Sequence, residues 1–441
     1  MILSQKLISL LLLLIFQTLN VSNSTNILCF ETERKALLSF KQDLQDPLGI
    51  LSSWVVGEED CCKWYGIVCD NSTGHVQELR LAAYSYEEDY RPLQGKINPS
   101  LLDLKKLSHL NLSGNYFEGT QIPSFIGSLV SLRYLDLSWA GFDGVIPHQL
   151  GNLSSLRHLD LADYSYEFKL YVENLHWLSS LSSLEYLDIT YVNLSKASDH
   201  WLHAINKLTS LLELHLGDCE LGHIHPLSYT NFTSLSILYM SDNNFNYFIP
   251  DWVFSLSSLV ELYLSSSQFI GSFPNGSFSL TSLTRLDVSN NSLSCTIPNY
   301  FYGFSNLEVL NLGGNKLQGV VSNSIRNLTS LVHLSLAGNA LVGELPASMG
   351  DLCNLQSIDL SRNKLNGSLP ESLGSLSNLQ DLDISNNLFE GVVSEVHFAN
   401  LTNLSSLKAS KNSLSLRVNP NWIPPFHLDD LELGSWNLGS L

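Results

Sequence analysis

The chain has 441 residues, of which 44% are hydrophobic, so it has enough apolar material to bury a large core. Its 23 basic and 42 acidic residues give a formal net charge of -19. A negative field of this size repels phosphate groups, which excludes nucleic acid as a partner and disfavours binding to anionic membrane surfaces.

Residues 1–23 are predicted to be a secretory signal peptide. Lys6 precedes an apolar run from Leu7 to Phe16, and polar residues follow from Asn20. The run is too short to span a bilayer, and its place after a positive charge is typical of a cleaved signal. Because no later apolar run approaches about 20 residues, we expect no membrane span within this chain.

Residues 24–76 are predicted to form a cysteine-bearing cap ahead of a repeat array. A helix is expected from Glu31 to Leu44, and Asp46-Pro47 ends it. Its apolar face consists of Ala36, Leu37, Phe40 and Leu44. Trp54 and Trp64 provide apolar bulk that would cover the open end of the first repeat.

Four of the seven cysteines lie in this cap, at Cys29, Cys61, Cys62 and Cys69. Adjacent cysteines cannot easily meet disulfide geometry, so Cys29 and Cys69 each take one of the two adjacent cysteines, and two pairings remain open. The shorter loop favours Cys62 with Cys69. A zinc site is the alternative, but no histidine stands at ligand spacing nearby, and secretion favours disulfides.

Residues 77–441 contain a recurring Leu-x-Leu unit, and seven consecutive intervals between the first apolar residues of these units are 24 residues long. Such a period is typical of a solenoid, in which each repeat buries its apolar edge against its neighbours. The alternation predicts one short strand per repeat, followed by an outer segment too short for full helices and expected to form 3₁₀ turns. About fifteen repeats are predicted, the last of them incomplete. Their first apolar residues, here called the lead residues, are Leu79, Leu110, Leu135, Leu159, Leu187, Leu214, Leu238, Leu262, Leu286, Leu310, Leu334, Ile358, Leu382, Leu407 and Leu431.

An asparagine stands five residues after the lead residue in many repeats. Its amide is expected to satisfy backbone groups of the turn that leaves each strand, which would cost about 1–3 kcal/mol apiece if buried without partners. Glycine then lets the backbone turn, and proline holds an extended outer segment. The asparagine row comprises Asn115, Asn243, Asn291, Asn315, Asn339, Asn363, Asn387 and Asn412.

Three motifs of the cap and one of the repeats are specific for one protein family. The cap motifs are Glu33-Arg34-x-Ala36-Leu37-Leu38-x-Phe40, Asp46-Pro47-x-Gly49-x-Leu51-Ser52-Ser53-Trp54 and Cys61-Cys62-x-Trp64-x-Gly66-Ile67-Val68-Cys69. The repeat motif is Leu-x-Gly-x-Ile-Pro, seen from Leu293 to Pro298 with Cys295 in the glycine position. With these motifs the chain resembles the plant extracellular leucine-rich-repeat proteins throughout, apart from the signal peptide. The resemblance implies an α/β leucine-rich-repeat solenoid, a curved right-handed superhelix with a parallel β-sheet on its concave face and 3₁₀ or short helical segments on its convex face.

Among these proteins the chain looks most like the receptor-like proteins, including the group that resembles receptors for fungal xylanase elicitors. This resemblance implies a plant defence receptor that binds an extracellular protein or peptide and signals through a partner receptor kinase with its own leucine-rich-repeat ectodomain. It implies a place on the outer face of the plasma membrane if a C-terminal anchor follows, and in the cell wall space otherwise. The chain ends inside the repeat begun at Leu431, without a cysteine cap, so we expect a fragment or a truncated product. No cofactor is predicted.

Eleven Asn-x-Ser/Thr triplets that begin after the predicted signal peptide agree with secretion and are expected to carry N-linked glycans, although an asparagine- and serine-rich repeat also forms such triplets by chance. They begin at Asn71, Asn111, Asn152, Asn193, Asn231, Asn275, Asn290, Asn327, Asn366, Asn400 and Asn403.

Aromatic and acidic residues gather beside the lead residues of six successive repeats, on what should be the concave face. Exposed tyrosine and tryptophan are typical interface anchors. Asp136, Asp160 and Asp188 stand on consecutive strands about 5 Å apart, so each adjacent pair repels by just under ~1 kcal/mol even in water, and a basic ligand segment would relieve this. We predict a ligand-binding patch made of Tyr134, Asp136, Trp139, His158, Asp160, Asp163, Tyr186, Asp188, Tyr191, Glu213, His215, Asp218, Tyr239, Asp242, Glu261 and Tyr263.

A purely structural explanation competes with this patch. Aspartate is common after the lead residue in such repeats, and Asp287, Asp359 and Asp383 are interpreted as a solvated row without a ligand. Longer intervals precede Leu110, Leu187 and Leu214, and insertions in solenoids often form loops on a binding edge. A tolerated surface loop explains them equally well. The first insertion contains Tyr84, Tyr86, Glu87, Glu88, Asp89 and Tyr90.

The three cysteines outside the cap are expected to be free and mostly buried. Cys219 takes an asparagine position and Cys295 a glycine position, and residues three strands apart lie beyond bridging distance. A metal site formed by Cys219, His223 and His225 is the alternative, but it lacks a fourth ligand.

Catalysis is not predicted, because the chain has no Gly-x-Ser-x-Gly elbow, no Gly-x-x-x-x-Gly-Lys loop and no His-Glu-x-x-His helix. Two other binding functions remain open. One is a secreted inhibitor of a pathogen wall-degrading enzyme, like the polygalacturonase-inhibiting proteins. The other is an anchorless decoy. The length of the array favours a receptor over an inhibitor.

Overall fold

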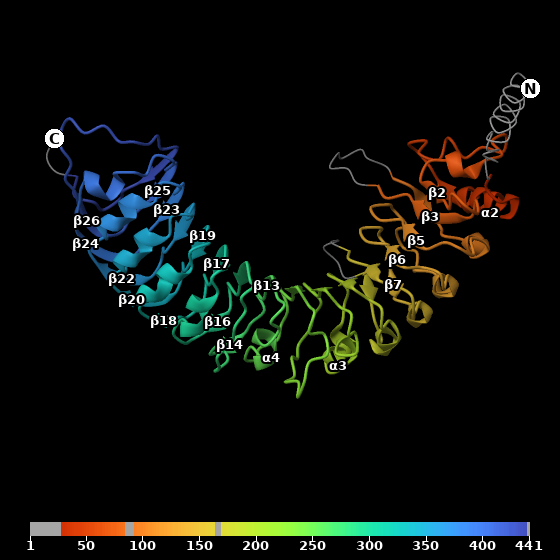
Figure 1. Ribbon diagram of the computed structural model, residues 1–441, viewed down its shortest axis with the longest axis horizontal. Coiled ribbons are helices and arrows are strands. Elements are labelled where there is room, and N and C mark those ends of the chain that lie inside the picture. Colours follow the sequence, from red (N-terminus) through yellow and green to blue (C-terminus); the bar gives the residue numbers. More distant parts are fainter. Residues whose placement is uncertain (1–27, 84–91, 164–168, 439–441) are drawn as a thin grey trace, which may run out of the picture.

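The computed structural model describes residues 28–83, 92–163 and 169–438. The predicted signal peptide and the segment from Tyr84 to Tyr90 lie outside the described residues. The chain forms an arc whose inner face is lined by strands, with the cap at one end and the last repeats at the other (Figure 1). This is the leucine-rich-repeat solenoid that the sequence predicts.

One sheet of 16 strands follows the inner face of the arc. Its first two strands, β2 and β3, are antiparallel, and every later neighbour pairs in parallel. The lead residues pair with one another from Leu79 with Leu110 to Leu407 with Leu431, as the spacing predicts. The strands are β2 (Ile67–Cys69), β3 (Val76–Arg80), β5 (His109–Asn111), β6 (Tyr134–Asp136), β8 (His158–Asp160), β10 (Tyr186–Asp188), β11 (Glu213–His215), β12 (Ile237–Tyr239), β13 (Glu261–Tyr263), β15 (Arg285–Asp287), β17 (Val309–Asn311), β19 (His333–Ser335), β21 (Ser357–Asp359), β23 (Asp381–Asp383), β25 (Ser406–Lys408) and β27 (Asp430–Glu432).

The core lies between this sheet and the outer segments. From β3 to β25 the strands point the lead residue into the core, and an apolar residue two positions later does the same, so Leu159 and Leu161 are both fully buried. The lead residue of the last strand, Leu431, is 53% exposed. The residues on either side of the lead residue face the concave surface instead, since side chains alternate along a strand. Packing therefore constrains the leucines, and the concave positions are free to vary.

The convex side consists mainly of short 3₁₀ helices, as predicted, and two segments form short α-helices, α3 (Trp201–Ile205) and α4 (Asp251–Phe254). A convex segment of this length follows most strands and turns the chain back toward the next one. The 3₁₀ helices of the repeats are Pro99–Asp103, Ser124–Ser128, His148–Asn152, His176–Ser180, Ser195–Ala197, Asn299–Gly303, Asn323–Asn327, Ala347–Asp351, Glu371–Ser375 and Glu395–Phe398.

Smaller ladders run along the flank of the arc. They consist of β7 (Gly144–Val145) with β9 (Leu170–Tyr171), β14 (Ile270–Gly271) with β16 (Ser292–Leu293), and the series β18 (Gln318–Gly319), β20 (Ala340–Gly343), β22 (Lys364–Gly367), β24 (Leu388–Val393) and β26 (Ser413–Leu416). Among the described residues no strand pair of this kind lies between Asn193 and Ile270. The flank is therefore regular toward the C-terminal end and interrupted at the middle of the arc.

The cap helix α2 (Glu31–Gln42) ends two residues before the predicted Leu44. Leu44 belongs instead to β1 (Leu44–Gln45), which pairs with β4 (Gln94–Gly95), because Gly95 admits the backbone of Asp43 and Leu44 at close range. The other residues of the predicted apolar face, Ala36, Leu37 and Phe40, are buried.

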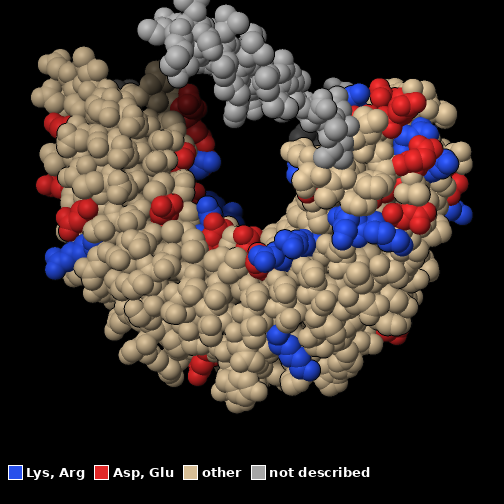
Figure 2. Space-filling view, turned by 45° about the vertical axis from the view of Figure 1, so that its right-hand side comes forward, with Lys and Arg blue, Asp and Glu red and all other residues tan. Residues whose placement is uncertain are grey.

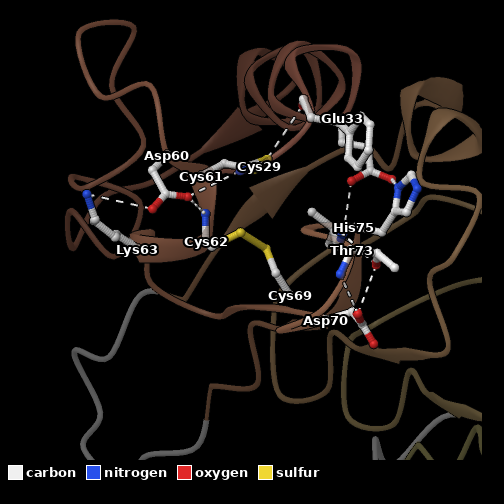
Figure 3. The surroundings of a disulfide bond; sticks show 12 residues. Cys29, Glu33, Asp60, Cys61, Cys62, Lys63, Cys69, Asp70, Thr73 and His75 are labelled. Atoms are coloured by element: carbon white, nitrogen blue, oxygen red, sulfur yellow. Dashed lines mark hydrogen bonds and ion pairs between the residues drawn. A yellow bond between two sulfur atoms is a disulfide. The ribbon is translucent and has the colours of Figure 1, made fainter. Parts of the chain in front are cut away.

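The cap is closed by two disulfides, Cys29–Cys61 and Cys62–Cys69, with Cα–Cα distances of 5.4 and 5.5 Å (Figure 3). This is the pairing that the shorter loop favours. Glu33 fastens helix α2 to the first strands, since its carboxylate accepts a hydrogen bond from Val76 N at 2.8 Å and contacts His75 Nδ1 at 2.9 Å. The rings of Trp54 and Trp64 stack at 5.6 Å and cover the first repeat, as predicted.

The asparagine row has the predicted role. Asn291 Nδ2 donates to the carbonyls of Leu264, Val288 and Ser289 at 2.8–3.0 Å, and its Oδ1 accepts from Phe269 N at 2.8 Å. Cys219 takes the same position, and its thiol donates to the carbonyls of Ile189 and Gly217. Because that thiol is buried in the row, it is turned away from the metal site considered with the two nearby histidines.

The other free cysteines differ from the expectation of mostly buried thiols. Cys295 is half-buried, and Cys353 is exposed beside Asp351, whose carbonyl accepts from its thiol. Cys353 follows a 3₁₀ helix on the convex side, where the repeat does not require an apolar residue. The expectation is therefore wrong for Cys353.

Candidate ligand-binding surface

A row of seven aromatic rings crosses the concave face from β5 to β13. Four rings, those of His109, Tyr134, His158 and Tyr186, stack almost parallel, with centroids 4.0–4.1 Å apart. The row continues with His215, Tyr239 and Tyr263 at 5.4–6.1 Å and with larger tilts. Arg285 ends it, with its guanidinium 5.9 Å from the centre of the Tyr263 ring. We call these seven rings the aromatic ladder.

Between Tyr186 and His215 the rings of the aromatic ladder shift from one side of the lead residue to the other. Its first four members precede the lead residue of their strand, and the last three follow it. Glycine at position 217 permits this change, because a Cβ there would collide with the ring of Tyr239. The sequence shows the aromatic residues on both sides of the lead residues. The close approach of the Tyr239 ring to Gly217 follows only from the stacking of the repeats.

The aspartates of the patch are less exposed than the sequence predicts. Asp136 and Asp188 are only 5% and 6% exposed. The Asp136 carboxylate accepts from Ser138 N at 3.0 Å and from Ser138 Oγ at 2.7 Å, and the Asp188 carboxylate accepts from Thr190 N at 2.8 Å. These side chains fold back to cap the turn that leaves the strand, so the expectation of solvent-facing carboxylates is wrong for both.

The same turn cap recurs in the aspartates interpreted as a solvated row. Asp287, Asp359 and Asp383 each accept from the amide two residues on, at 2.8–3.0 Å. They are half-buried rather than solvated. The common Leu-Asp-Leu pattern is therefore explained by backbone satisfaction, which costs about 1–3 kcal/mol per buried group when it is lost.

Burial produces opposite pKa shifts in two neighbours on β8. It raises the pKa of Asp160 to about 8, and the charges of Asp188 and Asp136 raise it further. Burial also lowers the pKa of His158 to about 4. Near neutral pH both groups are therefore largely uncharged, and the middle of the patch is less negative than its sequence suggests.

Trp139 and Tyr191 are held in a backbone conformation that large residues rarely adopt. Both stand four residues after the lead residue, with φ of 55° and 62°. Gly114, Gly314 and Gly338 fill the same position in other repeats and also have positive φ. A non-glycine residue there costs roughly 1–2 kcal/mol. The same positive φ recurs at this position at Arg362 and Lys411, so it belongs to the repeat, and Trp139 differs in presenting a large ring that is 52% exposed.

A shallow acidic hollow of about 360 Å³ lies next to the ladder, lined by Asp218, Glu220, Asp242 and neighbouring polar residues. Burial, followed by the charge of Asp242, raises the pKa of Asp218 to about 6, and a hydrogen bond with Tyr191 partly offsets this. The pKa of Asp242 is also raised by burial. This hollow provides a second place where a cation would be favoured.

The other patch residues line the concave surface with the ladder. Glu213 lies 3.7 Å from His215, and Tyr263 donates to Glu261 at 2.7 Å. Asp163 is 7% exposed and is buried at the edge of the patch. The structure thus brings the sixteen predicted residues onto six adjacent strands and their exits, with Asp136, Asp163 and Asp188 largely covered. The sequence-based patch missed His109 and Arg285, which only ring contacts across strands identify.

The described residues contain no group of three or more His, Cys, Asp or Glu side chains placed to hold a metal ion. Nor does any helix in that part of the chain have the length and hydrophobicity needed to cross a membrane. Charged side chains are sparse on the outer face at the middle of the arc and gather toward its two arms (Figure 2).

Family models match the cap and most of the array. Residues 30–70 match a model described as the leucine rich repeat N-terminal domain. Residues 210–269, 281–341 and 353–414 match one leucine rich repeat model, and residues 106–129 and 131–153 match another. Together these matches cover more than half of the chain.

Curated relatives include two receptor-like proteins of Solanum lycopersicum. Receptor-like protein EIX1 is 42% identical over 207 residues, which is 45% of this chain and 20% of that protein. Receptor-like protein EIX2 is 51% identical over 126 residues, which is 28% of this chain and 12% of that protein. The matched part thus spans a fifth or less of these relatives.

Solved structures with the same fold include plant receptors. The structure titled PEPR1-AtPEP1 matches 92% of this chain and 59% of its own, with a TM-score of 0.75 and 26% identity. The structure of a TDR receptor matches 71% of this chain and 53% of its own, with a TM-score of 0.63 and 29% identity. The chain therefore belongs to the leucine-rich-repeat family, has a disulfide-bonded N-terminal cap, and is similar in sequence and fold to plant receptor-like proteins and receptors.

Proposed function

We propose that this ectodomain binds an extracellular protein or peptide, of microbial origin, through the concave surface between Tyr134 and Tyr263. The observation that carries the proposal is the aromatic ladder together with the strained, exposed Trp139. Rigid aromatic side chains provide large contact areas at low entropic cost, which is why they dominate binding interfaces.

The charge of this surface favours a basic ligand segment. On strands β6 to β13, the residues before and after each lead residue, and those four positions after it, include eight Asp or Glu and no Lys or Arg. The acidic hollow adjoins them. A cation placed beside Asp160 would lower its raised pKa, so binding would release a proton.

We extend this proposal from ligand binding to signalling. The relatives EIX1 and EIX2 are named receptor-like proteins, and this resemblance supports defence signalling through a partner receptor kinase with its own leucine-rich-repeat ectodomain. It also supports a place at the outer face of the plasma membrane. Binding and recognition are assigned to this chain, and catalysis to the partner.

The proposal can be tested with three random octapeptide pools in which one position is fixed as Arg, Ser or Glu. The secreted chain is immobilised, and binding of each pool is measured by interferometry at low and high salt. We expect the Arg pool to bind most strongly and to weaken as salt rises. Equal binding of the Glu pool would contradict a basic ligand.

Two matched triple variants locate the surface. Tyr134→Ala, Trp139→Ala and Tyr186→Ala together should weaken Arg-pool binding at least about tenfold, the usual effect of losing an aromatic anchor. His333→Ala, Arg362→Ala and Asp381→Ala, at equivalent concave positions further along, should leave it unchanged. Because Tyr134 and Tyr186 are half-buried, Trp139→Ala alone serves as the variant that preserves folding. Loss of binding in the second triple variant, and none in the first, would place the ligand elsewhere.

A further inference from the structure

The eleven Asn-x-Ser/Thr triplets are distributed unevenly over the faces of the arc. Asn152 and Asn327 end 3₁₀ helices of the convex side, and Asn366 lies in β22 on the flank. Asn193 forms an isolated bridge with Tyr171 on the same flank. Only Asn111 and Asn290 occupy columns of the concave surface, the first directly after its lead residue and the second four positions after.

These two asparagines border the proposed binding surface on both sides. Asn111 is on β5 and pairs with Asp136 of β6, where the patch begins. Asn290 follows β15, the strand next to β13, where the patch ends. The repeats between them contain Asn152, Asn193, Asn231 and Asn275, all of which lie off the sheet. Six adjacent strands, β6 to β13, are thus left without a concave triplet.

Both side chains can carry a glycan without loss of local structure. Asn111 Oδ1 caps its turn by accepting from Ser113 N at 3.0 Å and from Ser113 Oγ at 2.6 Å, so the amide nitrogen is not the atom that holds the turn. Asn290 is exposed, with φ of 54°, a conformation that asparagine tolerates better than most residues. Both amide nitrogens are therefore suitable points of attachment.

We infer that N-linked glycans on Asn111 and Asn290 frame the concave surface and leave an open window over strands β6 to β13. Asn111 on β5 and Asn290 after β15 stand seven strand spacings of about 4.8 Å apart, which leaves about 34 Å between the two attachment points. An extended peptide crossing the strands at about 3.3 Å per residue spans this opening with about ten residues. The frame thus limits the length of ligand that can lie flat on the aromatic ladder. This limit on the ligand rests on the proposed function, whereas the presence of the glycans does not.

The first test contains no ligand. The chain is secreted from plant cells, and peptide mapping with enzymatic deglycosylation measures occupancy at each triplet. We expect Asn111 and Asn290 to be glycosylated in most molecules. Unmodified Asn111 or Asn290 as the main form would overturn the inference.

Hydroxyl-radical footprinting then compares the glycosylated and deglycosylated chain. Removal of the glycans should increase oxidation of Tyr134 and Tyr263 at the borders and leave Tyr186 and Tyr239 at the centre unchanged. An increase at the two central tyrosines would show that glycans cover the window, and no change at the borders would show that they point away from it. Either result would overturn the frame.

The structure also offers matched variants. Asn111→Asp and Asn290→Asp remove each acceptor and place aspartate where Asp136 and Asp242 already stand in the same columns. Asp160→Asn with Ala162→Ser places an acceptor inside the window and copies the local structure of Asn111 and Ser113. Its control is Asp160→Asn alone, which has no acceptor triplet.

The glycan placed inside the window should abolish binding of the Arg-fixed octapeptide pool. Asp160→Asn alone loses only one carboxylate of the patch, so it should bind the pool more weakly than the wild type and clearly more strongly than the glycosylated double variant. Unchanged binding by the glycosylated double variant would overturn the window. If the pool does not bind the unmodified chain, while occupancy and footprinting give the expected results, the proposed function fails and the glycan frame stands.

Discussion

Strands β6 to β13 and strands β15 to β25 are built on the same frame and present different surfaces. In both regions the lead residues pair in unbroken register. The asparagine row is continuous from Asn291 to Asn412 in the second region, whereas the first region has only Asn243 at this position. The first region, which we call the ladder region, bears the stacked rings and eight acidic side chains. The second, the C-terminal region, has small or mixed polar residues such as Ser335, Ser357 and Lys408 in these columns.

The two regions also differ in the residues at the left-handed position and in their flank. The ladder region includes the aromatic residues Trp139 and Tyr191 there, whereas the C-terminal region has glycine or polar residues with the same positive φ, such as Gly314, Arg362 and Lys411. Its flanking ladder runs through β18, β20, β22, β24 and β26, whereas the described flank of the ladder region is interrupted. Local departures from the ideal repeat thus coincide with the surface richest in binding side chains. Function in a solenoid lies in the positions that packing leaves free.

The largest expected effect concerns the shared frame. Leu161→Asp in the ladder region and Leu312→Asp in the C-terminal region each bury a charge at a fully covered position. Both should lower the free energy of unfolding by more than about 4 kcal/mol and abolish secretion. Secretion yield and thermal unfolding check this, with Val320→Asp at a 60% exposed site as control. Normal melting of either variant would show that the two regions do not share one core.

A single asparagine of the row should contribute equally to stability in either region. Asn243→Ala and Asn363→Ala each remove an amide that bonds three carbonyls and at least one backbone N–H. Each should cost about 3 kcal/mol, because the buried backbone groups lose their partners. Chemical denaturation provides the measurement. A loss of unfolding free energy below about 1 kcal/mol in only one of the two variants would show that the asparagine does not stabilise both regions in the same way.

The aromatic ladder should distinguish the regions. Tyr186→Ala removes a ring in contact with His158 and His215. It should lower the free energy of unfolding by about 1–3 kcal/mol. Ser357→Ala, at the same position relative to the lead residue in the C-terminal region, should cost almost nothing. Tyr186→Phe retains the stack and serves as the conservative control. If Tyr186→Ala melts like the wild type, the rings do not stabilise one another.

The last comparison is a pH dependence limited to the ladder region. The pKa of Asp160 is about 8 in the folded chain and near its ordinary value of about 4 when unfolded. The unfolded chain therefore binds fewer protons between these values, so the contribution of this group to stability falls as pH rises from about 4 to about 8. Asp160→Asn should be more stable than the wild type at pH 8, and the difference should shrink toward pH 4.

Asparagine at position 160 can still cap its turn, as Asn311 does by accepting from Gly313 N at 3.1 Å. Asp383→Asn, in the same column of the C-terminal region, is the control for the substitution itself. Denaturation curves from pH 4 to pH 8 supply the comparison. A difference between Asp160→Asn and wild type that does not change with pH would show that this carboxyl is not buried.

The sequence by itself determined the solenoid, its strand positions and the residues of the core. Leu-x-Leu spacing and the asparagine row are local patterns that recur at the same place in each repeat. The strands of neighbouring repeats therefore pair in one register, as the pairing of Leu310 with Leu334 illustrates. The cap motifs likewise identified the family and the cysteines that pair. Such features follow from the sequence because each repeat contacts only its neighbours.

Only the tertiary structure decided what the concave residues do. Asp136 and Asp188 turn back to cap their own strand exits, Tyr186 stacks between neighbours, and Gly217 admits the ring of Tyr239. Rotamers, ring contacts and burial depend on side chains about 24 residues apart that meet only when the repeats stack. The end of helix α2 at Gln42 has the same origin, since Leu44 is taken by a strand from the first repeat. Periodicity specifies where a side chain stands, and packing across strands decides whether it faces solvent or the turn beneath it.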